Sequence, residues 1–217
     1  ARLYALDAQH VALAWSTYDW YGYEDGGSGS GVNAPATHVV VVDISTPAAP
    51  VVQGRLSLPF SVDLNGWWGS LDGGESVVQL GDKLVFRRIN RPAWDSNDLE
   101  KAWLEVVDLS DPATPVSSAS LALPDGFGHS LLIENGNQIL TSHWEPVDGE
   151  AGKVKFFLDR VLFPPAGAPL LAQSVNVPGA LLSFDAATSH ALTIDFHRVK
   201  VPAVSADNCY QNYGYNY

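Results

Sequence analysis

The chain has 217 residues, of which 46% are hydrophobic and 17% are charged, and its formal net charge is −12 at pH 7. This composition is typical of globular proteins and unlike that of disordered chains. An acidic chain repels the phosphates of nucleic acids, so we expect no nucleic-acid partner; solubility, a cation or a basic partner are the alternative reasons for the charge. No apolar run approaches the roughly 18 residues of a membrane-spanning helix, so we expect no membrane-spanning segment.

The N-terminal residues predict a β-hairpin, because apolar residues at 3–6 and 11–15 flank the turn residues at 7–10. Asp, Asn and Gly between two apolar strands favour a tight reversal of the chain. The same pattern predicts three further hairpins. Their strands lie at 77–80 and 84–86, at 131–133 and 139–140, and at 181–184 and 191–194.

A second kind of hairpin follows the first. Residues 39–50 read Val-Val-Val-Val-Asp-Ile-Ser-Thr-Pro-Ala-Ala-Pro, residues 104–115 read Leu-Glu-Val-Val-Asp-Leu-Ser-Asp-Pro-Ala-Thr-Pro, and a worn third copy lies at 164–169. The β-branched residues fit a buried strand, Asp and Ser start a turn, and the prolines end the strand pairing. Asp108 follows Asp43 by 65 residues, and we expect the two to occupy equivalent positions.

Two hairpins make one unit of four antiparallel strands. We place such units at 1–59, 60–124 and 125–178, a partial unit at 179–197, and a Tyr- and Asn-rich segment at 198–217. Four-stranded units that repeat at this length are typical of β-propeller blades, whereas a β-sandwich would not explain the repeat. The residues expected in the core are Val40, Val42, Val106, Leu132, Leu140 and Leu182.

The predicted fold is therefore all-β and propeller-like. Closed propellers have about four to eight blades, so we expect an incomplete arc of a larger propeller, with the missing blades on another segment or another chain. The exposed sheet edges of an open arc need such partners. Because the chain begins at Ala1 and contains no Met, we expect a processed product or a piece of something longer.

The pattern at 39–50 and 104–115 resembles the blade repeats of secreted bacterial β-propeller proteins, and it is similar to the repeats of LVIVD-repeat propellers of cell-surface proteins. The resemblance implies a propeller fold and an extracellular or cell-envelope location, either the periplasm or the outer surface. It implies no catalytic residue. The single cysteine, Cys209, can form no internal disulfide; a lone cysteine suits a reduced compartment but could equally pair with a cysteine outside this chain.

Variable loops are predicted at 16–37, 87–102 and 141–153. Because strands alternate in direction, these loops share one rim of the sheets, where binding residues commonly lie. Their Trp and Tyr residues favour a recognition surface, although the rings could also cover the core or wedge between blades. The candidate binding residues on this rim are Trp20, Tyr21, Tyr23, Trp67, Trp68, Arg87, Trp94, His143, Trp144 and His197.

Asp19, Glu24 and Asp25 are calcium candidates, since hard cations prefer oxygen ligands, but their spacing matches no EF-hand; no other cofactor is expected. The sequence carries no nucleophile elbow and no His-Glu-x-x-His motif. We therefore expect a non-enzymatic propeller module that recognises a protein or a surface. The alternatives are a propeller hydrolase or lyase with His143, His197 and Arg87 at its mouth, and a structural subunit of a multi-chain assembly.

Overall fold

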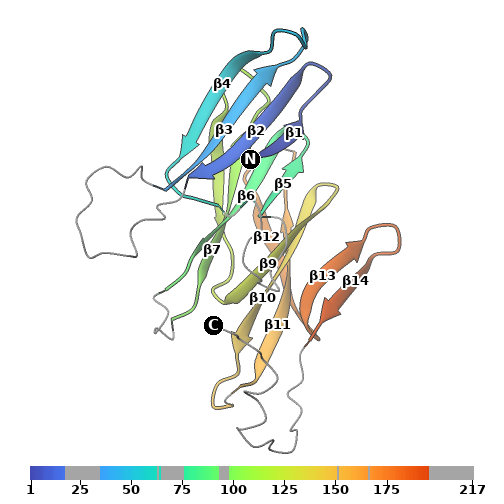
Figure 1. Cartoon of the computed structure of the whole chain (residues 1–217). Helices are drawn as coiled ribbons and strands as arrows, with labels where there is room; N and C mark the ends of the chain where they lie inside the picture. Colours follow the sequence, from blue (N-terminus) through green and yellow to red (C-terminus); the bar gives the residue numbers. More distant parts are fainter. Residues whose placement is uncertain are drawn as a thin grey trace, which may run out of the picture.

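The computed structural model describes residues 1–17, 35–62, 64, 76–92, 98–150, 152–165 and 167–195. The regular elements among these residues are all β-strands, which confirms the all-β prediction (Figure 1). No helix in this part of the chain is long and apolar enough to cross a membrane.

The strands form sheets that follow one another along the chain, and every pair of neighbours is antiparallel. Sheet 1 contains β1 (Arg2–Ala5), β2 (His10–Thr17), β3 (Ala36–Asp43) and β4 (Val51–Leu58). Sheet 2 contains β5 (Val77–Leu80), β6 (Lys83–Asn90), β7 (Lys101–Asp108) and β8 (Val116–Ala122). Sheet 3 contains β9 (Phe127–Asn135), β10 (Gln138–Pro146), β11 (Val154–Leu162) and β12 (Leu170–Val177). Sheet 4 contains β13 (Ala180–Asp185) and β14 (His190–Ile194).

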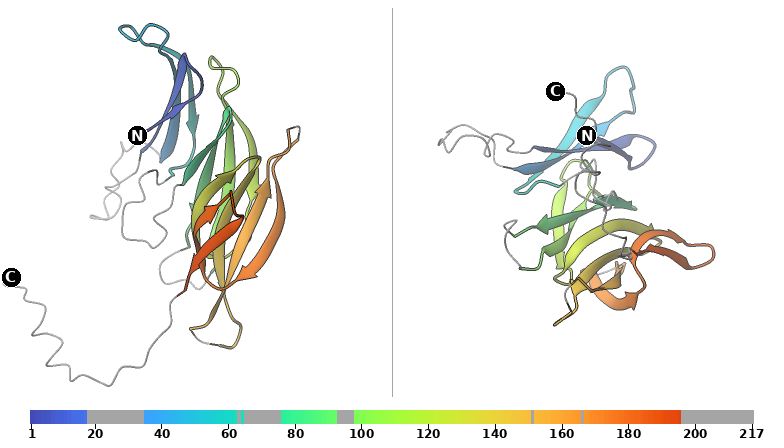
Figure 2. Two further views of the ribbon diagram at one scale, coloured as in Figure 1. Left: turned by 90° about the vertical axis from the view of Figure 1, so that its right-hand side faces the viewer. Right: turned by 60° about the horizontal axis from the view of Figure 1, so that its bottom comes forward.

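The sheets stack face to face in an open arc. Strand β9 lies beside β5 on one side and beside β13 on the other, so the first strands of sheets 2, 3 and 4 are neighbours. Figure 2 shows the sheets fanned in chain order, from β1–β4 in blue to β13–β14 in red. None of the sheets closes on itself, and the arrangement is that of an incomplete propeller arc.

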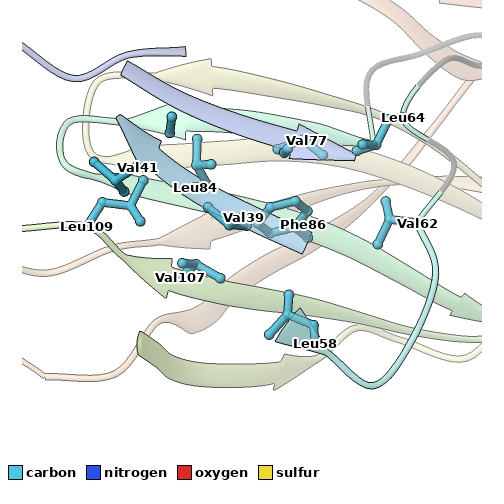
Figure 3. Packing of buried hydrophobic residues seen from close by; sticks show 12 residues of the cluster. Val39, Val41, Leu58, Val62, Leu64, Val77, Leu84, Phe86, Val107 and Leu109 are labelled. Carbon is cyan, nitrogen blue, oxygen red and sulfur yellow. The ribbon is translucent and has the colours of Figure 1, made fainter. Parts of the chain in front are cut away.

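Apolar cores fill the spaces between neighbouring sheets. Between sheets 1 and 2, Val39 and Val41 of β3 meet Leu84 and Phe86 of β6 and Val107 of β7, and all five side chains are fully buried (Figure 3). Burying a side chain of this size contributes about 1.5–3 kcal/mol. The opposite face of sheet 2 packs against sheet 3 through a second core of Val78, Val85, Leu104, Leu132, Ile139 and Val161. Sheet 2 is thus buried on both faces, which explains its runs of consecutive apolar residues.

The repeated turns occupy equivalent positions, as predicted. Asp43 ends β3 and pairs with His10, while Asp108 ends β7 and pairs with Lys83. The carboxylate of Asp43 accepts a hydrogen bond from the backbone N–H of Ser45 at 2.7 Å, and that of Asp108 accepts one from Ser110 at 2.9 Å. Each aspartate therefore starts its turn by the mechanism expected for this residue.

The core prediction is correct in part. Val40, Val106, Leu132 and Leu140 are buried, and Val42 is half-buried. The prediction for Leu182 is wrong, because its side chain is 48% exposed. Leu182 lies on β13 in the last sheet of the described arc, where no described sheet follows to cover it.

Candidate functional site

The predicted loops are shorter than expected, because the strands beside them are longer. Strand β6 continues to Asn90 and β10 continues to Pro146, so Arg87, His143 and Trp144 lie within strands. The pairing with the third strand of each sheet extends this far, from Lys83↔Asp108 to Asn90↔Lys101 in sheet 2. The assignment of these residues to loops is therefore wrong. The other candidates lie outside the described residues, and these are Asp19, Trp20, Tyr21, Tyr23, Glu24, Asp25, Trp67, Trp68, Trp94 and His197.

The strand ends that these loops connect lie on one side of the arc. Thr17 pairs with Ala36, Asn90 with Lys101, and Pro146 with Val154. In Figure 1 these ends lie towards the lower left, whereas the tight turns of the hairpins lie towards the upper right. The loop rim and the turn rim are thus separate faces of the molecule.

A chain of hydrogen bonds runs across sheet 3 near the loop rim. Nδ1 of His143 on β10 lies 2.6 Å from Oδ2 of Asp159 on β11. The other oxygen of Asp159 accepts a hydrogen bond from the Ser174 hydroxyl of β12 at 2.6 Å. The strand register produces this arrangement, because Asp159 pairs directly with Ser174 and with Thr141, two residues from His143. The Asp159 side chain is fully buried, and both of its oxygens have partners.

Aromatic rings enclose His143. Its ring stacks on Phe157 at 5.1 Å between centroids and on His129 at 5.6 Å. Gly126 makes room for it, since a Cβ atom at that position would lie 2.6 Å from Cδ2 of His143. Gly128 has a φ of +57°, and a Cβ atom there would lie 2.5 Å from Nε1 of Trp144. The sequence from Gly126 to Gly128 is therefore shaped to receive the two side chains of β10.

The two histidines differ in protonation. Burial alone would lower the pKa of His143, but the hydrogen bond and the charge of Asp159, assisted by Glu145, outweigh burial and raise the pKa above its ordinary value. Burial, together with the nearby charges of His143 and Arg87, lowers the pKa of His129 to about 3. At neutral pH His129 is therefore neutral, and protonated His143 is favoured as the partner of the Asp159 carboxylate.

The same positions in sheet 2 carry a related group. Arg88 lies opposite Trp103 in the register, as His143 lies opposite Phe157. The Arg88 guanidinium is 3.8 Å from the centroid of the Trp103 ring and makes a 2.8 Å ion pair with Glu105. Glu105 and Asp159 hold the same position in the pairing. A cation, a carboxylate and an aromatic ring thus recur together in two sheets.

Sheet 1 keeps the stacked pair without the carboxylate. Trp15 lies opposite His38, and their rings stack at 5.1 Å. We did not predict from the sequence that the three pairs share one register, although their spacing from the strand starts indicates it. Trp15, Arg88 and His143 each lie five residues after the first residue of their strand, and these first residues are His10, Lys83 and Gln138.

A histidine held by a carboxylate can transfer protons, but the His143 side chain is only 1% exposed. In the described ranges, no group of three or more His, Cys, Asp or Glu residues is placed to hold a metal ion. Arg87 is also buried, and it acts on the pKa of His129 from the neighbouring sheet. His143, Asp159, His129 and Arg87 therefore form a polar cluster that extends the core between sheets 2 and 3.

Four-stranded antiparallel sheets that stack in an open arc, with a repeated strand-turn-strand pattern, define a β-propeller-like repeat module. Residues 36–57 match the family model of the LVIVD repeat, and the matched segment is the β3–β4 hairpin that contains the Asp43 turn. Neither the comparison with curated proteins nor that with solved structures found a significant match.

Proposed function

We propose that this chain is a non-enzymatic β-propeller module of a bacterial secreted or cell-envelope protein, and that it recognises a protein or a surface through the variable loops of one rim. The observation that carries the proposal is the separation of the two rims. The turn rim is built from repeated short turns, whereas the loop rim joins strands through segments that differ in length and sequence from one sheet to the next. Such variation on a repeated scaffold is typical of binding surfaces.

The location in this proposal rests on the LVIVD repeat at 36–57, since such repeats are typical of cell-surface proteins. Residues Trp20, Tyr21 and Tyr23 are the proposed contacts of the first loop. Aromatic side chains of this kind supply large apolar contact areas with a polar group at the tip, which suits a recognition surface.

Binding to intact bacterial cells tests the proposal. We expect the fluorescently labelled chain to bind, and Trp20→Ala combined with Tyr21→Ala to weaken binding about tenfold or more, as for central aromatic contacts of interfaces. The matched control combines Gln9→Ala with Thr46→Ala, two exposed residues of the turn rim. Equal loss in both variants, or no binding by the starting chain, would contradict the proposal.

A propeller hydrolase or lyase is the second candidate, and the 2.6 Å contact between His143 and Asp159 is the observation that favours it. A catalytic role requires His143 to reach a substrate. Turnover of ester, glycoside or uronic-acid substrates that His143→Gln abolishes, while cell binding is retained, would establish this function in place of the first.

A further inference from the structure

The last sheet of the arc has an apolar face without a described covering. Leu182, Leu192 and Ile194 are 48%, 56% and 37% exposed. Leu192 and Ile194 lie two and four residues after His190, the first residue of β14. The equivalent residues of β6 are Val85 and Arg87, and those of β10 are Leu140 and Ser142. All four are buried.

Strands β6, β10 and β14 begin at equivalent positions in their hairpins. His190 pairs with Asp185 as Lys83 pairs with Leu80 and Gln138 pairs with Asn135, so each begins the second strand of its hairpin. Val85 belongs to the core that sheet 3 covers. Leu192 therefore occupies a position that is covered by the next sheet wherever a next sheet is present.

The first sheet has an apolar face on its other side. Leu3 pairs with Leu13, and Leu13 pairs with Val40, so these side chains share a face. This face points away from the core formed by Val39 and Val41. Val52, which pairs with Val42, continues the same face on β4. Leu3 on β1 is 64% exposed and Val52 on β4 is 44% exposed, whereas Val40 between them is 6% exposed, so the exposed part of this face lies along its two edge strands.

The two open faces are of opposite kinds. Within the chain, the face of each sheet that points forward in the sequence packs on the backward-pointing face of the next sheet, as Val85 of sheet 2 packs with Ile139 and Leu132 of sheet 3. The open face of sheet 4 points forward, and the open face of sheet 1 points backward. Inside the arc, a forward face like that of sheet 4 is covered by a backward face like that of sheet 1.

We propose that sheet 4 of one copy of this chain binds sheet 1 of a second copy, head to tail. The contact would place Leu182, Leu192 and Ile194 of one copy against Leu3, Leu13 and Val52 of the other, and it would extend the propeller arc across two polypeptides. Such an interface is heterologous, so it gives rings where the rotation closes and open chains where it does not. The inference rests on the propeller architecture of the proposed function, but not on recognition by the loop rim.

The test is a complementation experiment in sedimentation velocity. We expect the full chain to associate as its concentration rises. Leu192→Asp should block the sheet 4 face and Leu3→Asp the sheet 1 face, so each variant alone should sediment as a monomer. An equal mixture of the two should form a dimer, because each variant retains the face that the other has lost. Leu170→Asp on β12, where Leu170 is exposed outside both faces, is the matched control and should associate like the starting chain.

A starting chain that stays monomeric at every concentration would overturn the proposal. A Leu3→Asp variant that still dimerises would also overturn it, because that result indicates a contact between two copies of the sheet 4 face. A mixture that stays monomeric would overturn it as well, provided that circular dichroism shows both variants to be folded. The loop variant with Trp20→Ala and Tyr21→Ala should associate normally, so a failure of cell recognition and a failure of assembly can be told apart.

Discussion

Gly54 of β4 lies directly against the Pro115 turn of the next sheet. A Cβ atom on Gly54 would be 2.5 Å from Cδ of Pro115 and 2.4 Å from the carbonyl oxygen of Pro112. The outer strand of sheet 1 therefore approaches the backbone of the second repeated turn more closely than any side chain would allow. The prolines of the turn have a second role, since they form a surface on which the preceding sheet packs.

We expect Gly54→Ala to destabilise the chain by about 1–3 kcal/mol, because the added methyl group meets backbone atoms that cannot move aside easily. Urea denaturation followed by circular dichroism measures the change. Arg55→Ala, at an exposed neighbouring position, is the control and should stay within about 0.5 kcal/mol of the starting chain. A neutral Gly54→Ala variant would show that the two sheets do not make this contact.

Leu140 tests the core. Its side chain is buried, and Leu140→Ala should reduce the free energy of unfolding by about 2–5 kcal/mol. Leu170→Ala removes the same atoms from an exposed position on β12 and should change stability by less than about 0.5 kcal/mol. Similar losses in the two variants would contradict the packing of β10.

The ion pair of His143 and Asp159 should make stability depend on pH. The pKa of His143 is raised above 6.5 in the folded chain, so its contribution is complete below pH 6.5 and is lost as the pH rises through the raised value. We expect His143→Gln to be more damaging at pH 6 than at pH 9 (values chosen on either side of the usual histidine range, about 6.5). Urea unfolding of both chains at the two pH values measures the difference.

The equivalent pair in sheet 2 supplies the control. Unlike histidine, arginine as a residue type does not titrate near neutral pH. The cost of Glu105→Gln, which breaks the ion pair with Arg88, should therefore be the same at both pH values. A His143→Gln cost that is constant with pH, or that grows as the pH rises, would rule out the charged pair.

His129 should make stability depend on pH in the opposite direction to His143, because its pKa is lowered and not raised. Its pKa is lowered from 6.5 to about 3, so the neutral buried ring stabilises the chain at pH values above 6.5, and stability is lost as the pH falls towards 3. Asp7 and Asp43 have pKa values lowered from 3.8, so they stay ionised between pH 6.5 and 3.8. In this window we expect the stability of the His129→Phe variant to fall less steeply with decreasing pH than that of the starting chain. Thermal unfolding across this window measures it, and an unchanged slope would show that His129 is not the group responsible.

The sequence predicted the repeat well because each turn depends on local chemistry. Asp43 and Asp108 bind the backbone two residues further on, so the residue type alone specifies the turn. The strand ends were harder to predict. Arg87, His143 and Trp144 resemble loop residues because each is charged or aromatic, but they lie within strands. Arg87 is buried, His143 contacts Asp159 of β11, and Trp144 stacks on Phe127 of β9, and no single strand reveals these surroundings.

The polar cluster could not be derived because its members are distant in the sequence. His143 meets Asp159 from the next strand and His129 from the preceding strand. Their meeting depends on the register of sheet 3, including the bulges between β9 and β10. A hairpin prediction gives the order of the strands but does not locate a bulge.

The stacking of the sheets in chain order affects how this molecule comes apart. Sheet 3 is held from two sides, since β9 lies beside both β5 and β13, whereas the two-stranded sheet 4 follows it at one end of the described arc. In an array of this kind, stability is the sum of what each unit and each boundary contributes, and opening spreads from the ends inward. Amide protons of β13 and β14 should therefore exchange long before those of β6 and β10, and fraying of the arc should precede its melting.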